Sequence, residues 1–264
     1  MIMSIEVLND KFEPKQKLVR FLGLTILVSI PFWILSALST QFIPEGLPVN
    51  NIGFVMVFIP GSVALILTYK ERGTKATKNL LRRAFDYKKI KRKAWYLPII
   101  TLIPLISFLS YALMAFLGIN LSLVPICLES LPILLILFLI FAISEEIGWQ
   151  GYVFDIMKTQ WNSLFSTILL GVIWALWHLP LYLLQDSVSM ISIVGQCLFT
   201  AVLRVLIVWI YNNNDKSVFA GVMVHTISNI CTMLLPIYSI PLGPLIVSTM
   251  LIISVMICLS VKPL

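Results

Sequence analysis

Two adjacent glutamates stand in the middle of a long apolar stretch, residues 131–152, which reads LPILLILFLIFAISEEIGWQGY. A charged side chain at the centre of a bilayer costs on the order of 3 kcal/mol even on the lenient insertion scales. Glu145 and Glu146 therefore fit only a bundle in which other helices screen them from lipid. The only two histidines of the chain, His178 and His225, also fall in apolar segments. Ionisable residues inside a membrane segment indicate a functional site by default.

Composition indicates that the whole chain is a polytopic membrane protein. Hydrophobic residues make up 59% of the 264 residues and charged residues 12%, against about 25% charged in a soluble domain. One helical crossing needs about 20 apolar residues, so eight crossings nearly use up the chain and leave no room for a second, soluble domain. We predict an all-α bundle with eight spans, at residues 21–40, 52–69, 94–118, 131–157, 162–184, 190–211, 218–235 and 243–260.

The distribution of basic residues predicts the orientation in the membrane. The loops after the first, third, fifth and seventh expected spans contain no lysine or arginine, whereas the segment 70–93 alone holds eleven of the nineteen basic residues. By the positive-inside rule, both termini and this segment are expected on the cytoplasmic side of the cell membrane. That arrangement requires an even number of spans. Because nearly all basic residues lie at span ends, the net charge of +7 does not indicate nucleic-acid binding.

The only long connector, residues 74–93, reads TKATKNLLRRAFDYKKIKRK. Its apolar residues recur at helical spacing among cations, which predicts an interfacial helix on anionic lipid headgroups. A role in gating substrate entry is the alternative. We expect one integral membrane domain with two parts. Residues 1–130 comprise three spans and the basic segment 70–93, and residues 131–264 comprise five spans and hold the functional residues.

Polar residues recur four positions apart on three of the expected spans. Residues at this spacing lie on one face of a helix, and polar groups inside a membrane must turn away from lipid. Glu145 lies about 100° around the helix from Glu146, so the two carboxylates can address different partners. The arrangement that exposes the least polar surface to lipid points all three faces into one interior cavity. The pairs are Glu146 with Gln150, Trp174 with His178, and His225 with Asn229.

These motifs, in this order, resemble those of the type II CAAX-protease and bacteriocin-processing (CPBP) family of intramembrane glutamic-type endopeptidases. The matching stretches are SEEIGWQGY at 144–152, WALWHLP at 174–180 and HTISN at 225–229. The resemblance covers roughly residues 140–235. It implies a membrane-embedded hydrolase of peptide bonds that opens to the cytoplasmic side. Its substrate would be a peptide or a membrane-anchored protein.

The resemblance also implies a role for each residue. Glu145 and His178 would activate a water, and His225 and Asn229 would stabilise the oxyanion. The physical chemistry is consistent with these roles, because a carboxylate can take a proton from water. Imidazole and amide N–H groups are also suitable donors to a tetrahedral oxyanion. Trp174 is expected to support the site as a wall of the pocket.

One residue departs from the family pattern. The family usually has an arginine four residues after the second glutamate, and this chain has Gln150. A glutamine offers only a neutral hydrogen bond, so Glu146 is either protonated or finds a cation elsewhere. Arg204, within the sixth expected span, is the one intramembrane candidate. We expect its side chain to snorkel to the cytoplasmic surface instead, because it lies near the end of that span.

Other interpretations stay open at this point. Glu145, His178 and His225 form a candidate ligand set for zinc. Because these residues come from three helices and an HExxH motif is absent, we favour a mechanism without a cofactor. Intramembrane glutamate and histidine residues also suit a proton-coupled transporter. The third alternative is a catalytically silent scaffold, such as a bacteriocin-immunity or cell-envelope factor.

Overall fold

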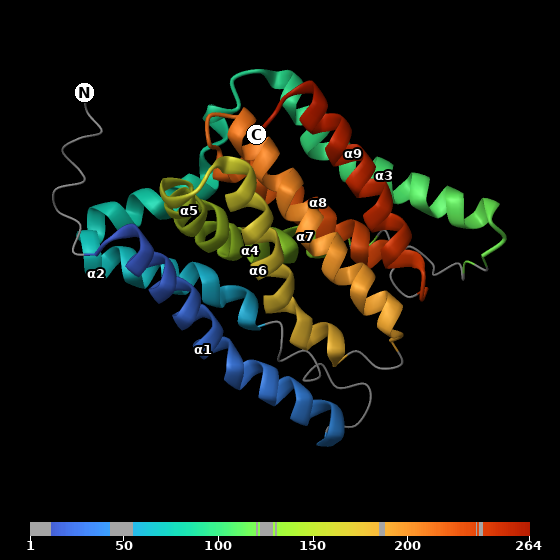
Figure 1. Ribbon diagram of the computed structural model, residues 1–264, viewed down its shortest axis with the longest axis horizontal. Coiled ribbons are helices and arrows are strands. Elements are labelled where there is room, and N and C mark those ends of the chain that lie inside the picture. The colour runs from blue at the N-terminus through green and yellow to red at the C-terminus, as the bar shows by residue number, and fades with distance from the viewer. Residues whose placement is uncertain are drawn as a thin grey trace.

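The computed structural model describes residues 12–42, 55–119, 121, 129, 131–184, 188–235, 237 and 240–264. These residues form helices and turns, and no strand occurs among them, which confirms the predicted all-α class. The helices pack side by side as a bundle (Figure 1). In this part of the chain, eight helices have 17 residues or more: α1 (Pro14–Phe42), α2 (Ile59–Arg82), α3 (Tyr96–Phe116), α4 (Leu131–Gly148), α6 (Ser163–Leu183), α7 (Met190–Asn213), α8 (Val218–Leu234) and α9 (Gly243–Val261).

Six of these helices are long and apolar enough to cross a membrane, namely α1, α3, α4 with its continuation to Gln160, α6, α7 and α9. Helix α8 is apolar but shorter, and α2 combines an apolar first half with a basic second half. Each of the eight expected spans overlaps one of these helices, and six of the helices qualify as spans by their own length and composition. The protein is a multi-pass membrane protein. Residues 1–11 and 43–54, to which the orientation argument also refers, lie outside the described residues.

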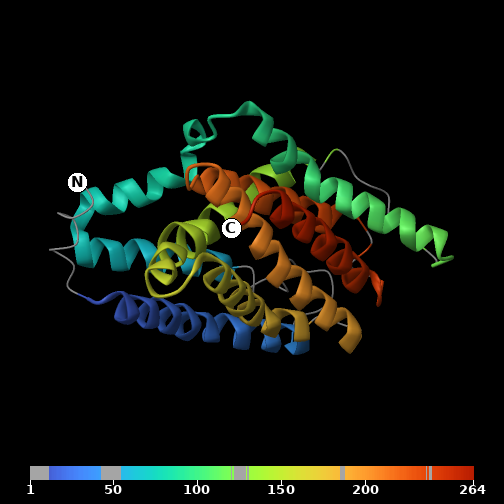
Figure 2. The ribbon, with the colours of Figure 1, turned by 45° about the horizontal axis from the view of Figure 1, so that its top comes forward.

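Helix α2 changes direction sharply at Gly73. This residue has φ 73° and ψ −172°, in the half of backbone space that glycine enters without a steric penalty. Figure 2 shows the two halves of α2 as separate arms that meet at a sharp bend. The second arm ends at Arg82, and short 3-10 turns follow it. The interfacial helix expected over residues 74–93 is therefore helical only in its first half.

The apolar residues of the basic segment 70–93 divide between two surroundings. Leu80, Ala84 and Ile90 are buried, whereas Leu81 and Phe85 are exposed. Nine of the eleven basic residues in this segment are also exposed. The segment thus attaches to the bundle through one set of apolar side chains and presents the other set among cations.

Arg83 fixes this segment to the end of the bundle where the short helix α5 (Asp155–Gln160) and α7 finish. Its guanidinium donates to the carboxylate of Asp155 (3.1 Å) and to the hydroxyl of Tyr211 (2.6 Å). It also donates to the backbone oxygen of Gly151 (2.5 Å). Burial opposes the charge of Arg83, but Tyr211 and Asp155 outweigh it and raise the pKa of the guanidinium above its usual value.

Asp86 fixes the same segment to the start of α8. Its Oδ1 accepts from the hydroxyl of Ser217 (2.8 Å) and from the backbone N–H of Phe219 (3.1 Å). The first N–H groups of a helix lack partners within the helix, so Asp86 satisfies a donor that α8 would otherwise leave free. The basic segment is therefore joined to three helix ends rather than lying loosely beside them.

Close contact between α2 and α4 depends on two glycines. A Cβ at Gly148 of α4 would lie 2.5 Å from the backbone carbonyl carbon of Pro60, and a Cβ at Gly61 would collide with the backbone oxygen of Ser144. Small residues at such positions let two membrane helices approach closely. Because Gly148 follows Glu146 by two residues, this contact fixes the part of α4 that carries both glutamates.

The two ends of the bundle differ in charge. Successive helices alternate in direction, so the connections between them fall at one end or at the other. At one end α1, α3, α6 and α8 begin and α2, α5, α7 and α9 finish (Figure 1). We call this the basic end, because the segment 70–93 is anchored there, and the other one the opposite end. Helix α7 packs against α6, α8 and α9, and its residues 206–211 are all buried. This central position allows α7 to carry a charged side chain away from lipid.

Candidate active site

The two glutamates directly precede an irregular part of their helix. Helix α4 ends at Gly148 and continues as the π-helical turn η7 (Trp149–Phe154) into α5. Such a turn accommodates an extra residue in a helix and is frequent at functional sites. Glu145 and Glu146 are 2% and 0% exposed. Both carboxylates therefore point into the protein interior and away from lipid.

Glu146 is held by side chains from two other helices. Arg204 in α7 donates to both carboxylate oxygens of Glu146. Its Nη1 lies 2.6 Å from Oε2 of Glu146 and its Nη2 lies 3.0 Å from Oε1, which makes a bidentate pair. Nδ1 of His225 in α8 lies 2.9 Å from the same Oε1. Arg204 and Glu146 are both 0% exposed. Three helices therefore meet at the carboxylate of Glu146.

The expectation that Arg204 snorkels to the surface is wrong. Its guanidinium is buried because the Glu146 carboxylate and the face of the Trp174 ring take the place of the water it would find there. Cζ of Arg204 lies 3.9 Å from the centroid of that ring, within the range of a cation–π contact. Arg204 of α7 supplies the positive charge that Gln150, four residues after Glu146, does not supply. The sequence named Arg204 as the one intramembrane candidate for a partner of Glu146, because it is the one basic residue inside an expected span, but the expectation of snorkelling kept it out of the predicted site.

Gln150 takes no part in this ion pair. Its amide is 0% exposed, and neither its oxygen nor its nitrogen has a hydrogen-bond partner among the described residues. The expected pairing with Glu146 presumes α-helical geometry over four residues, whereas the π-helical turn that begins at Trp149 changes the direction of the side chains after it. The partner of Glu146 comes from α7 instead.

Trp174 of α6 contacts most groups of the site. Its indole N–H donates to Oε2 of Glu145 at 2.8 Å. Its ring meets the rings of His178 and His225 edge to face, with centroids 5.2 and 5.1 Å away. Trp174 therefore orients one carboxylate oxygen of Glu145 and supports both imidazoles, which is more than the pocket wall that sequence reasoning expected.

The hydrogen bonds of the two histidines define which ring nitrogen carries a proton. Nδ1 of His178 lies 2.9 Å from the backbone oxygen of Trp174, and a carbonyl only accepts, so this nitrogen is the donor. Nδ1 of His225 faces the Glu146 carboxylate, which is paired with an arginine, so it donates as well. In both rings Nε2 is the nitrogen left available for chemistry.

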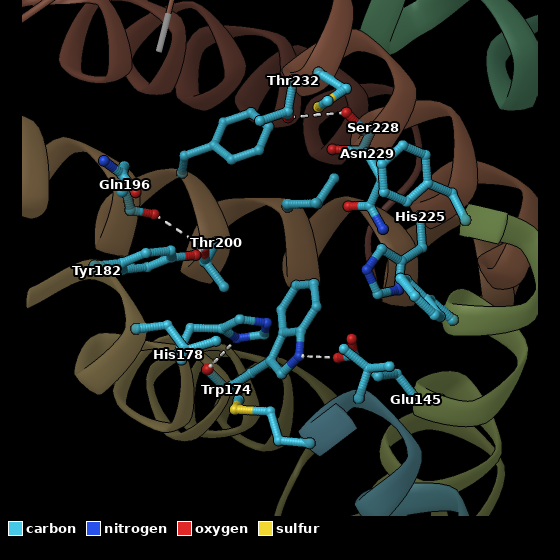
Figure 3. A pocket seen from close by; sticks show the side chains of 18 residues that line it. Glu145, Trp174, His178, Tyr182, Gln196, Thr200, His225, Ser228, Asn229 and Thr232 are labelled. Atoms are coloured by element: carbon cyan, nitrogen blue, oxygen red, sulfur yellow. Dashed lines mark hydrogen bonds between the residues drawn. The ribbon is translucent and has the colours of Figure 1, made fainter. Parts of the chain in front are cut away.

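Four of the predicted residues line one cavity of about 420 Å³. Trp174 also lines it, while Glu146 and Gln150 lie outside its lining. The other walls are mainly apolar and include aromatic side chains from α4 and α7. Figure 3 shows the four polar groups around the same space: the carboxylate of Glu145, the rings of His178 and His225, and the amide of Asn229.

The candidate zinc ligands do not converge on a common point in the part of the chain that the structure describes. No group of three or more histidine, cysteine, aspartate or glutamate side chains there is arranged to hold a metal ion. Glu145, His178 and His225 each bond a different neighbour through one polar atom. Each of the three side chains keeps one further polar atom outside these bonds.

Comparisons with known proteins match the part of the chain that holds these residues. The family model of Rce1-like type II CAAX prenyl endopeptidases matches residues 127–231, a range that includes all seven predicted site residues and Arg204. CAAX prenyl protease 2 from Methanococcus maripaludis is 28% identical over 248 residues, which cover 86% of each chain. The match thus extends well beyond the motifs into the spans on either side of them. The chain is thus similar to the Rce1-like type II CAAX prenyl endopeptidases over the part that holds the candidate site, and to one CAAX prenyl protease along most of its length.

Proposed function

We propose that this protein is an intramembrane endopeptidase that hydrolyses peptide bonds of membrane-anchored proteins or peptide precursors. Its similarity to CAAX prenyl endopeptidases supports an intramembrane protease that acts on protein substrates. The observation that carries the finer proposal is that four polar side chains from three helices line one cavity. Burying ionisable groups inside a membrane protein is costly, and a catalytic role accounts for that cost.

Glu145 is the proposed general base. The Trp174 N–H occupies Oε2 of Glu145, and the second oxygen is available to a water in the cavity that Glu145 lines. His178 presents Nε2 to the same space and holds the attacking water by a hydrogen bond. The water gives a proton to Glu145 while its oxygen adds to the peptide carbonyl carbon. Glu145 then passes this proton to the departing nitrogen, the C–N bond breaks, and a carboxylic acid, which loses its proton to water, and an amine are released.

His225 and Asn229 are the proposed donors to the oxyanion. They lie one helical turn apart on α8 and line the same cavity. The Glu146–Arg204 pair holds Nδ1 of His225 and so directs Nε2 toward the substrate. Nδ1 of His225 already carries a proton, so donation by Nε2 requires a second proton on the same ring. The carboxylate of Glu146 offsets the resulting positive charge. Donors that are fixed before the reaction stabilise the developing charge without reorganisation.

The basic segment 70–93 is the proposed contact with anionic lipid headgroups on the cytoplasmic side. Its nine exposed cations surround the exposed apolar residues Leu81 and Phe85. Each cation near an anionic membrane surface contributes about 1 kcal/mol of attraction. We therefore expect activity in liposomes to rise with the fraction of anionic lipid and to fall with added salt. Equal activity in neutral liposomes would remove this role.

Reconstituted protein and a fluorogenic peptide substrate separate the proposed roles. Asn229→Ala removes one oxyanion donor, so we expect kcat to fall by roughly 10²–10³-fold with little change in KM. Thr249→Ala is the matched control, because Thr249 is exposed and its hydroxyl bonds only the backbone of Leu245 in its own helix α9. Full activity of Asn229→Ala would remove the donor role. Failure of the wild type to cleave any peptide would favour the transporter or scaffold alternatives.

A further inference from the structure

Many hydroxyl groups on the helices of this bundle are engaged within their own helix. A serine or threonine inside a helix can donate to the backbone oxygen four residues earlier. A hydroxyl engaged in this way has no proton left for another partner, because it carries only one. This bond occurs at 2.7–2.9 Å on five different helices, at Thr68, Ser110, Thr167, Thr226 and Ser254.

Ser228 of α8 is an exception. The residue is 1% exposed, and its hydroxyl has no hydrogen-bond partner among the residues that the structure describes. Thr226 and Thr232 on the same helix both donate to the backbone oxygen four residues earlier, so α8 itself does not prevent this bond. A buried hydroxyl without a partner is unfavourable. Each such group needs an explanation, and a ligand that binds beside it is one.

Four hydroxyl groups belong to residues that line the cavity of the candidate active site. Oη of Tyr182 lies 2.7 Å from Oγ1 of Thr200, and Thr200 donates to the backbone oxygen of Gln196. Thr232 donates to the backbone oxygen of Ser228. Ser228 is the fourth, and among the described lining residues it is the one whose hydroxyl proton has no acceptor.

The walls of the cavity differ in what they offer to a peptide. Thr200 gives its one hydroxyl proton to Gln196, so the Tyr182 hydroxyl donates to Thr200 and keeps only lone pairs. The α8 wall instead offers the Ser228 hydroxyl and the Asn229 amide as donors. Figure 3 shows these two residues on one side of the cavity, with Tyr182 and Thr200 on another. The carbonyl and the N–H of a trans peptide group point in opposite directions, so carbonyls suit α8 and N–H groups suit Tyr182.

We propose that Ser228 is a substrate-binding residue whose hydroxyl donates to a main-chain carbonyl oxygen of the peptide beside the scissile bond. This inference rests on the proposed function, which directs the scissile carbonyl toward His225 and Asn229 on the same helix. In an extended peptide, carbonyls two residues apart face the same side. A chain that presents its scissile carbonyl to α8 therefore presents a second one, and Ser228, three residues after His225 on the same helix face, meets it.

This contact recognises the main chain of the substrate rather than one of its side chains. Ser228 makes and breaks no covalent bond, because no base among the described residues accepts from its hydroxyl, and a serine without such a base is a weak nucleophile. Much of the remaining lining is apolar and includes Phe141, Phe199 and Met233. The cavity thus suits an extended apolar peptide segment whose carbonyl oxygens are free to accept.

Peptide binding to a protein that cannot cleave tests this contact. Glu145→Gln serves as the background, and the ligand is a fluorescent peptide that the wild type cleaves. We expect Ser228→Ala to raise the Kd of this peptide roughly 3–10-fold, the effect of losing one neutral hydrogen bond. Thr232→Val is the matched control, because Thr232 lines the same cavity and its hydroxyl is already bonded within α8. We expect the control to keep the Kd of the background.

The unfolding midpoint separates substrate binding from a structural role. Ser228→Ala removes a buried hydroxyl that has no partner in the described part of the chain, so we expect the midpoint not to fall. A lower midpoint together with an unchanged Kd would assign the hydroxyl to the packing of α8 and overturn the inference.

Peptides in which sulfur replaces one carbonyl oxygen identify the group that Ser228 contacts. Sulfur is a weak acceptor, so replacement at the contacted carbonyl should weaken binding to the background protein. We expect the same replacement to cause no further loss in Ser228→Ala, because the hydrogen bond is already absent. Fully additive losses at every position would overturn the inference.

Failure of this inference differs from failure of the proposed function. If the wild type cleaves the peptide while Ser228→Ala binds it as tightly as the background does, the contact is refuted and the proposed function stands. A wild type that cleaves no peptide would overturn both.

Discussion

Removal of the Arg204 side chain tests how the bundle tolerates the Glu146 carboxylate in its interior. Arg204→Met keeps much of the apolar volume but leaves His225 as the remaining polar partner of Glu146. The two charged groups are 0% exposed and are joined at 2.6 and 3.0 Å. Breaking a buried pair by removing one partner costs about 3–5 kcal/mol, a large share of the roughly 5–15 kcal/mol that stabilises a folded protein. We therefore expect Arg204→Met to unfold at a much lower temperature than the wild type.

The double variant isolates the unpaired charge as the cause of this loss. If the two changes acted independently, Glu146→Gln combined with Arg204→Met would cost about 6–10 kcal/mol, twice the single loss. Because the double variant leaves neither charge unpaired, we expect it to cost less than Arg204→Met alone. Unfolding in detergent, followed by tryptophan fluorescence, gives the midpoints of the wild type, of Arg204→Met, of Glu146→Gln and of the double variant. A wild-type midpoint for Arg204→Met, or a fully additive loss in the double variant, would refute the reasoning.

Position 150 offers a further test of the same ion pair. Gln150→Arg adds a second buried cation to a site where Glu146 already has one, so we expect it to destabilise the wild type. In an Arg204→Gln background the same change supplies the missing cation, and we expect it to restore part of the lost stability. A gain in stability from Gln150→Arg in the wild type would mean that Glu146 lacks a sufficient partner.

Trp174→Phe keeps an aromatic ring but removes the N–H that holds Glu145, so we expect kcat to fall while the unfolding midpoint changes little; an unchanged kcat would contradict the orienting role. Gly148→Ala forces a Cβ into the contact between α2 and α4, whereas a Cβ at Gly23 meets nothing within 4 Å. We therefore expect a lower unfolding midpoint for Gly148→Ala than for Gly23→Ala, and equal midpoints would show that the contact can relax. Strong chelators are expected to leave peptide cleavage unchanged, and a loss of activity that zinc restores would instead favour metal catalysis.

The membrane bundle could be predicted because its signals are local and strong. Each apolar run has about the length that a helix needs to cross a bilayer, and the loops between the runs alternate between those without and those with basic residues. The four-residue spacing between His225 and Asn229 also translates directly into one helix face. Their convergence with Glu145 and His178 on one cavity follows from the need to keep polar groups away from lipid.

The partner of Glu146 could not be predicted from spacing. Arg204 lies 58 positions away along the chain, and only packing between α4 and α7 brings the two residues together. A signal was nevertheless present, because two opposite charges inside a membrane bundle stabilise each other when they pair. The π-helical turn has no comparable signature in the sequence, and it is what separates Gln150 from the Glu146 carboxylate.

The basic segment illustrates a second limit. Its helical spacing is present in the sequence, but the bend at Gly73 and the anchoring contacts of Arg83 and Asp86 depend on the ends of other helices.

Peptide hydrolysis in water enriched with heavy oxygen tests directly whether Glu145 activates the attacking water. Glu145→Gln retains the size of the side chain and an oxygen that can accept from Trp174, but its amide cannot take a proton from water. For the wild type in liposomes, we predict a cleaved peptide whose new carboxylate carries one heavy oxygen atom. For Glu145→Gln at an unchanged unfolding midpoint, we predict almost no product. Cleavage by Glu145→Gln at the wild-type rate would contradict the proposed mechanism.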